Sequence, residues 1–334
     1  EIYLEKCIVN PKHVEVQIMG DEHGNVIHLF ERDCSIQRRH QKVVETAPAS
    51  ALPVELRQKI CNAALKLMKN VHYVNAGTVE FLVTPDGEFY FIEVNPRVQV
   101  EHTVTEMITG IDIVQTQIKV AEGYALDSDE IGIKSQDDVR CLGDAIQCRI
   151  TTEDPMNNFM PDSGKIMVYR SGGGNAYTGA IITPYYDSLL VKTTTYGRTH
   201  KEAAEKMLRV LKEFRIRGVK TNIGFLINVL KSPEFIAGTY NVNFIDDHPE
   251  LFNLPVVQDR GTKLLKYIGN TTINGYADAG HQDKPEFEAL ELPTPVAGPY
   301  PDGTKQKFDA MGPEKFSQWI KDQKKVFFTD TTMR

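Results

Sequence analysis

The chain has 334 residues, of which 41% are hydrophobic and 25% charged, as is typical of a globular protein with about two domains. Its formal net charge of −7 would repel phosphate backbones and argues against a nucleic-acid partner. No segment approaches the roughly 18 continuous apolar residues that a membrane span needs. The five cysteines include no C-x-x-C pair, which argues against a disulfide framework or a zinc knuckle and favours a reducing compartment.

The predicted elements alternate between hairpins and helices. Apolar and polar residues alternate in a hairpin over 14–29, and a second hairpin has strands over 78–83 and 88–94 around Thr84-Pro85-Asp86-Gly87. We expect helices over 53–69, 111–122, 199–214, 222–230 and 314–322, strands over 144–151, 164–170 and 326–328, an irregular connection over 124–143 and a linker over about 276–314. This order predicts an α+β fold with antiparallel sheets and a domain boundary near residue 139.

The segment from Glu93 to Glu101 is the first candidate site. Every odd position in it is polar, and every even position is apolar or proline. In an extended strand, one face would therefore present the side chains of Glu93, Asn95, Arg97, Gln99 and Glu101. Such a row could supply cation ligands, an oxyanion clamp and a general base. A solvent-facing edge strand is the alternative.

Glu80 strengthens the case for a metal site. If Thr84 pairs with Gly87 across the turn, Glu80 and Glu93 are diagonal neighbours about 7–8 Å apart at the backbone. Two converging carboxylates suit Mg²⁺, which prefers oxygen ligands. An exposed acidic pair on the outer face of a sheet is the alternative.

Three cations, or four with a protonated histidine, lie in Gln37-Arg38-Arg39-His40-Gln41-Lys42. A solvated turn usually explains such a run, but its position between two predicted strands could present cations to phosphate or bicarbonate. Gly172-Gly173-Gly174 is interpreted as a turn because no P-loop lysine follows it. The spacing of His13, His23 and His28 indicates no metal site.

Many short segments match one known family. They are Glu5-Lys6, His13-Val14-Glu15, Glu31 to Ser35, Gln37 to Lys42, Phe91 to His102, Glu106 to Gly110, Gln147 to Ile150, Glu153-Asp154-Pro155, Pro184 to Ser188 and Gly218 to Asn222. Over about residues 1–250, the sequence thereby resembles the biotin carboxylases, which are ATP-grasp enzymes. Later segments, Arg260 to Lys263, Tyr267 to Asn270, Ile273 to Gly275 and Phe328 to Arg334, resemble the members that carboxylate pyruvate rather than acyl-CoA.

The resemblance implies a reaction in two steps. ATP phosphorylates bicarbonate to carboxyphosphate, and the carbon dioxide released from it carboxylates N1 of biotin on a mobile carrier domain, as the first half-reaction from pyruvate to oxaloacetate. It implies an ATP-grasp lobe over 1–123, a biotin carboxylase C-terminal subdomain over 124–250, and over 251–334 a linker and the start of a carboxyltransferase or tetramerisation region. It also favours a homotetramer in a bacterial cytoplasm over one in a mitochondrial matrix.

The resemblance assigns roles to single residues. The expected ligands of Mg²⁺ or Mn²⁺ are Glu80, Glu93 and Asn95, and the expected ATP contacts are Glu5, Lys6, Ile8, His13, Gln37, His40 and Leu82. Glu101 would take the bicarbonate proton, with Lys42, Arg97, Gln99 and Val100 around the bicarbonate. Arg149 would stabilise the biotin enolate, and Asp187 is a further expected biotin contact.

Two departures limit the resemblance. The family's N-terminal lobe and glycine-rich lid, and a Gly-x-x-Arg segment after Gly174, have no counterpart here, and the similarity ends at Arg334 before the carboxyltransferase barrel. We therefore expect the chain to be part of a longer protein and to be inactive by itself. Another ATP-grasp ligase that joins a carboxylate to an amine, or a catalytically incomplete scaffold for oligomerisation, is the alternative.

Overall fold

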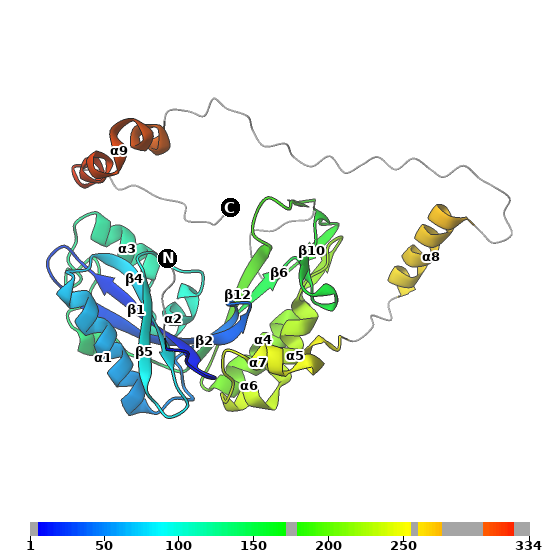
Figure 1. The fold of residues 1–334 in the computed structure, drawn as a ribbon, viewed down its shortest axis with the longest axis horizontal. Helices are drawn as coiled ribbons and strands as arrows, with labels where there is room; N and C mark the ends of the chain where they lie inside the picture. Colours follow the sequence, from blue (N-terminus) through cyan, green and yellow to red (C-terminus); the bar gives the residue numbers. More distant parts are fainter. Residues whose placement is uncertain (1–5, 172–178, 255–259, 276–302, 324–334) are drawn as a thin grey trace.

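The computed structural model describes residues 6–171, 179–254, 260–275 and 303–323 (Figure 1). Seven strands form one antiparallel sheet in the order β12-β6-β3-β2-β1-β4-β5. They are β1 (Lys12–Gly20), β2 (Val26–Arg38), β3 (Gln41–Ala47), β4 (Asn75–Val83), β5 (Phe89–Asn95), β6 (Asp144–Thr151) and β12 (Leu189–Gly197). The predicted α+β class with antiparallel strands is confirmed.

Helices and short strands surround this sheet. The helices are α1 (Val54–Asn70), α2 (His102–Thr109), α3 (Ile113–Ala121), α4 (His200–Glu213), α5 (Ile223–Lys231), α6 (Pro233–Ala237), α7 (Phe244–Asp247), α8 (Arg260–Asn274) and α9 (Thr304–Lys321). Short strands are β7 (Glu153–Asp154), β8 (Met160–Pro161), β9 (Gly164–Lys165), β10 (Val168–Arg170), β11 (Ile181–Ile182) and β13 (Arg215–Arg217). Both predicted hairpins are confirmed, as are α1, α3, α4 and α5 to within two residues at each end.

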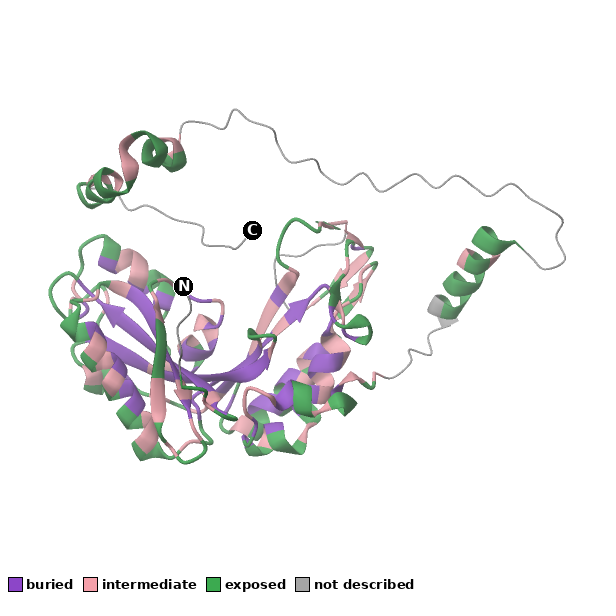
Figure 2. Ribbon diagram, in the orientation of Figure 1, coloured by how far each residue is buried: buried purple, intermediate pink, exposed green. Residues whose placement is uncertain are grey.

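The central strands have two different faces because apolar and polar residues alternate along them. In β1, Val14, Val16 and Ile18 lie on the side where α1 packs, and His13 and Glu15 lie on the other side. All five residues are buried, and Figure 2 shows that burial extends along the central strands. One face of the sheet is therefore polar without being open to solvent.

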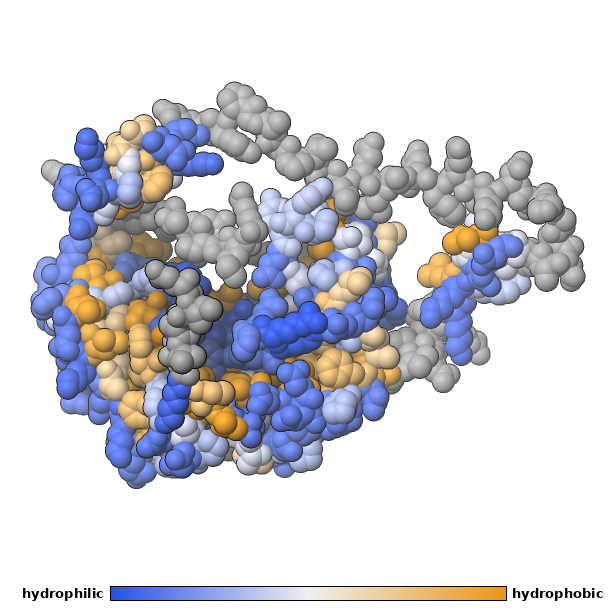
Figure 3. Space-filling view, viewed as in Figure 1, coloured by the Kyte–Doolittle hydropathy of each residue, from blue (hydrophilic) through white to orange (hydrophobic). Residues whose placement is uncertain are grey.

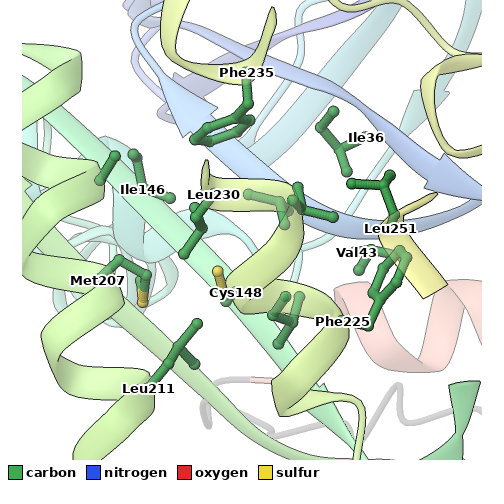
Figure 4. Close-up of a cluster of buried hydrophobic side chains, with 14 of the residues drawn as sticks. Ile36, Val43, Ile146, Cys148, Met207, Leu211, Phe225, Leu230, Phe235 and Leu251 are labelled. Carbon is green, nitrogen blue, oxygen red and sulfur yellow. The ribbon is translucent and has the colours of Figure 1, made fainter. Parts of the chain in front are cut away.

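A second apolar core joins the later part of the chain to the same sheet. Ile36 and Val43 contribute to it from β2 and β3, Met207 from α4, and Phe225 and Leu230 from α5 (Figure 4). Strand β6 also pairs directly with β3. The expected division of the chain at residue 123 stays a prediction, since one sheet and one core include residues from both sides of it.

Parts of the C-terminal prediction are wrong. The strand expected over 164–170 is divided into β9 and β10, and α8, which was not predicted, ends just before the expected linker. Helix α9 begins at Thr304, inside the expected linker, and kinks at Gly312, where φ is 75°. The helix expected over 314–322 is its second half. The predicted strand over 326–328 and the turn at Gly172-Gly173-Gly174 lie outside the described residues. Within the described ranges, no helix is both long and apolar enough to cross a membrane.

Candidate active site

Cross-strand pairing places polar side chains on one face of the sheet, because directly opposed residues of neighbouring strands share a face. The register pairs Glu93 with Glu80, Glu80 with Glu15, Glu15 with Arg32, Glu45 with Gln147, and Arg149 with Lys192. Figure 3 shows a strongly hydrophilic surface near the middle of the molecule. The site is built on this polar face.

Glu101 lies between two cations near the middle of the face. Lys42 Nζ is 2.7 Å from one carboxylate oxygen, and a terminal nitrogen of Arg149 is 2.9 Å from the other. The strand predicted over 93–101 is wrong beyond Asn95, where β5 ends and the chain turns before α2. Glu101 directly precedes α2 and is only 2% exposed. The turn therefore brings the predicted base inward.

Lys42 also contacts two further carboxylates. Its Nζ is 2.5 Å from Glu15 and 3.0 Å from Glu80. Burial disfavours a charged lysine, but these carboxylates, with Glu101, hold the pKa of Lys42 well above its ordinary value. Burial would likewise raise the pKa of Glu15, and Arg32 and Lys42 overcome this to lower it to about 2. Lys42 is thus a fixed cation beside Glu101.

Arg149 is held on the other side of Glu101. Its Nε donates to Glu45, a fully buried residue of β3, which also accepts from Gln147 Nε2 at 3.1 Å. Burial raises the pKa of Glu45, and Arg149 opposes that shift. Lys42, Arg149 and the exposed Asp187 line one pocket. The structure thus brings residues predicted for bicarbonate and for biotin to the same pocket.

Arg32 uses all five of its N–H donors inside the polar face. Its nitrogens donate to Glu15 (2.5 Å), Gln17 (2.7 Å), Thr105 (2.9 Å), Thr78 (3.2 Å) and Gln99 (3.2 Å). Because Gln99 accepts through its amide oxygen, its amide nitrogen points away from Arg32 and donates to Glu80 at 3.0 Å. Arg32 therefore orients Gln99, a predicted bicarbonate contact, as well as Glu15.

The three predicted metal ligands converge. Asn95 Nδ2 is 3.0 Å from a Glu80 oxygen and 3.1 Å from a Glu93 oxygen. The predicted register is wrong, because Thr84 bonds with Glu88 across a longer turn and a bulge interrupts the β4–β5 pairing. Glu80 is therefore directly opposite Glu93 rather than diagonal to it. Carboxylate oxygens are hard donors, so Glu80 and Glu93 fit Mg²⁺, while Asn95 turns its amide nitrogen towards them.

The basic run from Gln37 to Lys42 divides into two parts. Gln37 and Lys42 pair across β2 and β3, and the Gln37 amide contacts the ring of His13. His13 Nε2 lies 2.8 Å from Glu80, which links both predicted ATP contacts to the metal ligands. His40 is exposed at a turn with a φ of 63°. His40 thus belongs to a solvated turn, as in the alternative interpretation, whereas Gln37 and Lys42 form part of the site.

The remaining predicted contacts lie around this centre. Lys6 Nζ is 2.6 Å from the hydroxyl of Tyr90 on β5, Ile8 is half-buried, and Leu82 pairs with His13. Arg97 is half-buried, and its guanidinium makes no hydrogen bond or ion pair with any residue that the structure describes. The Val100 carbonyl accepts from Lys192 at 2.9 Å. Glu5 lies outside the described residues.

The sequence interpretation missed several members of the network. It gave no role to Glu15, Arg32, Glu45 or Lys192, and it did not predict α2. The sequence signal that could have pointed to these residues is the alternation of polar and apolar residues along β1. By itself, this pattern is the same as that of a strand with one face open to solvent. Only the pairing of seven strands shows that these side chains face one another.

Two family models match the chain. The ATP binding domain of the carbamoyl-phosphate synthase L chain matches residues 1–129, and the biotin carboxylase C-terminal domain matches residues 147–247. The first range includes the predicted metal ligands, Lys42 and Glu101, and the second includes Arg149 and Asp187.

Known proteins match the whole chain. It is 60% identical to a pyruvate carboxylase of Bacillus subtilis over 100% of its length, and covers 30% of that protein. A Rhizobium etli pyruvate carboxylase structure with the allosteric activator acetyl coenzyme A matches 100% of the chain at 50% identity and a TM-score of 0.76, and 34% of that chain is covered. The biotin carboxylase domain of Hydrogenobacter thermophilus 2-oxoglutarate carboxylase, in complex with MgADP, ADP and bicarbonate, matches 75% of the chain and 56% of its own, with 45% identity and a TM-score of 0.71. The chain thus spans about a third of the pyruvate carboxylases that it matches.

Proposed function

Because this chain belongs to the biotin carboxylase region of the pyruvate carboxylase family, we propose that the intact polypeptide uses ATP and bicarbonate to carboxylate biotin. A bicarbonate oxygen attacks the γ-phosphorus of ATP, ADP leaves, and carboxyphosphate is formed. Carboxyphosphate decomposes to phosphate and carbon dioxide, the phosphate takes the proton from N1 of biotin, and N1 attacks the carbon dioxide. This would be the first half-reaction in the conversion of pyruvate to oxaloacetate.

The position of Glu101 between Lys42 and Arg149 carries this proposal. Glu101 takes the bicarbonate proton, and Lys42, Arg97, Gln99 and Val100 hold the resulting anion beside it. Arg149 faces the same pocket and stabilises the negative charge that develops on the ureido oxygen of biotin. Asp187, on the rim of that pocket, is a further biotin contact. An ATP-grasp ligase that joins a carboxylate to an amine would not require Arg149 there.

Glu80, Glu93 and Asn95 are the residues that would hold Mg²⁺ or Mn²⁺. Bound there, the ion would neutralise charge on the ATP phosphates. His13 and Gln37 adjoin this group, and Lys6, Ile8, Leu82 and His40 complete the proposed ATP contacts. The support is the convergence of the Glu80 and Glu93 carboxylates on the side-chain amide of Asn95.

The proposal extends to partners. Biotin would arrive on a carrier domain, and the intact polypeptide would act as a homotetramer. The 60% identity with the Bacillus subtilis protein supports a bacterial cytoplasm rather than a mitochondrial matrix. Residues 1–123 would act as the ATP-grasp lobe and residues 124–250 as the biotin-facing subdomain.

Replacing the base tests the proposed function. Glu101→Gln keeps the shape of the side chain but cannot accept a proton at neutral pH, so bicarbonate-dependent ATP cleavage by the intact polypeptide should fall by about 10² to 10⁴. Glu22→Gln, at an exposed position in the β1–β2 turn, is the matched control and should leave the rate unchanged. An unchanged Glu101→Gln rate at saturating bicarbonate would remove Glu101 from the mechanism.

A further inference from the structure

Lys192 of β12 contacts the residues on either side of the proposed base, the backbone of Val100 and the side chain of His102. Its Nζ is 2.9 Å from the carbonyl oxygen of Val100 and 2.9 Å from Nε2 of His102. Lys192 is directly opposite Arg149 in the sheet, so both cations face the same segment. Arg149 contacts the Glu101 side chain, and Lys192 holds the residues before and after it.

The contact with His102 also fixes the imidazole. An ammonium group can only donate, so Nε2 of His102 accepts and the ring proton lies on Nδ1. That nitrogen is 3.2 Å from a Glu106 carboxylate oxygen one turn further along α2. Glu106 in turn accepts from the backbone N–H of Ile113 at the start of α3, at 2.8 Å. Lys192 therefore contacts α2 through the His102 ring, and Glu106 connects α2 to α3.

The same two strands hold the next residue as well. Thr103 Oγ1 is 2.5 Å from Gln147 of β6 and 2.8 Å from Thr194 of β12. The segment before α2 has no strand ladder of its own, because β5 ends at Asn95. Contacts from β6 and β12 therefore help to position the backbone of Glu101, beside those of Arg32 with Gln99 and Thr105.

We propose that Lys192 is a positioning residue for biotin carboxylation. By holding the carbonyl of the Val100–Glu101 peptide, it keeps the Glu101 carboxylate where Lys42 and Arg149 both reach it. This inference rests on the proposed function. A base must lie within hydrogen-bond reach of the proton it takes, and a displacement of about 1 Å can cost about 10²-fold in rate. Strands from the later part of the chain thereby position the base that acts on bicarbonate.

The test compares three substitutions in the intact polypeptide with biotin on its carrier. Lys192→Met removes the positive charge and the hydrogen-bond donor but keeps the length of the side chain. Lys192→Arg keeps the positive charge and the donor. Lys206→Met is the matched control, because the exposed Lys206 also donates to a carbonyl, that of Tyr196 at 2.7 Å. The measurements are kcat for bicarbonate-dependent ATP cleavage, KM for MgATP, and the thermal midpoint.

We expect Lys192→Met to lower kcat by about 10- to 100-fold while KM for MgATP changes less than about twofold. Lys192→Arg should recover most of the rate, and Lys206→Met should match the unaltered protein. An unchanged kcat for Lys192→Met, or kcat losses that simply follow loss of folded protein in both Lys192 variants, would overturn the inference.

A second variant keeps the test decisive if Lys192→Met fails to fold. Thr103→Val is nearly isosteric and removes the hydrogen bonds from Thr103 to Gln147 and Thr194. It should therefore lower kcat by about 3- to 10-fold and leave KM for MgATP unchanged. A normal rate in Thr103→Val would then overturn the inference. The unaltered protein separates the two proposals, because if it shows no bicarbonate-dependent ATP cleavage, the proposed function itself fails.

Discussion

Glu15 shows what each charge on the polar face does for its neighbours. It is fully buried and contacts Arg32 and Lys42, both at 2.5 Å. Glu101 is shared in the same way between Lys42 and Arg149. A buried ion pair adds little stability over an apolar pair, yet removing one partner leaves an uncompensated charge. The network is therefore better explained by a need to fix Lys42 and Arg149 than by stability.

Removing the charge of Glu15 should make the free energy of unfolding less dependent on pH in the acidic range. Folding lowers the pKa of Glu15 from 4.5 to about 2, so its stabilising effect is complete above about pH 4.5 and disappears as the pH falls towards 2. We expect Glu15→Gln to lower the free energy of unfolding at pH 7 by on the order of 3 kcal/mol. The difference from the unaltered protein should narrow between pH 4.5 and 2.

Urea unfolding of the intact polypeptide at pH 7, 5, 4 and 3 measures this effect. Glu22→Gln, at an exposed site, should change the free energy of unfolding by less than about 0.5 kcal/mol at each pH. A Glu15→Gln difference that is the same at every pH would contradict the assignment of the shift to ionisation of this carboxylate.

At the scale of elements, the helices and hairpins that depend on local sequence patterns could be predicted from the sequence. Helices α1 and α4 have one apolar face and clear starting signals, and the hairpin around residues 84–87 has a proline–glycine turn, so all three were predictable. The β4–β5 register was not, because a longer turn and a bulge each shift it by one residue. The turn after Asn95 could not be predicted either, since β6 and β12, far along the chain, hold it in place. Residue type was enough to propose Glu80, Glu93 and Asn95 as metal ligands, but only the structure shows that Glu80 lies directly opposite Glu93.

The junction between β12 and α4 gives a prediction about elements. A Cβ added to Gly197 would lie 2.5 Å from the backbone nitrogen of Ala203 and 2.9 Å from the carbonyl carbon of Glu202, both in α4. Backbone atoms cannot rotate away, so Gly197→Ala should lower the free energy of unfolding by about 1–3 kcal/mol. Gly269→Ala in α8 is the control, because its added Cβ meets nothing within 4 Å, and alanine favours a helix. Urea unfolding of both variants decides, and equal stabilities would show that α4 adjusts without cost.

At the scale of the whole molecule, the part of the chain after residue 139 shares one sheet and one core with the part before it. Strand β6 pairs with β3, and the core around α5 includes Ile36 and Val43 from the first part of the chain. The Val242 amide also donates to the Pro11 carbonyl at 3.0 Å. A separate domain would need its own core and a protected sheet edge. The part after residue 139 supplies most of this core, but Ile36, Val43 and Val44 complete it, and β3 covers the edge of β6.

We therefore expect residues 139–254, expressed alone, to show no cooperative thermal unfolding, whereas residues 6–254 should unfold in a single transition. Without β3, the shorter fragment exposes the hydrogen-bonding edge of β6 and loses Ile36, Val43 and Val44 from its core. Calorimetry and near-ultraviolet circular dichroism on both fragments measure the difference. Mixing residues 139–254 with residues 6–138 should restore part of the signal, because the missing strands are supplied in trans. A sharp transition in residues 139–254 alone would instead mean that this part folds independently and that β6 and β12 do not depend on the rest of the sheet to position Lys192 and Arg149.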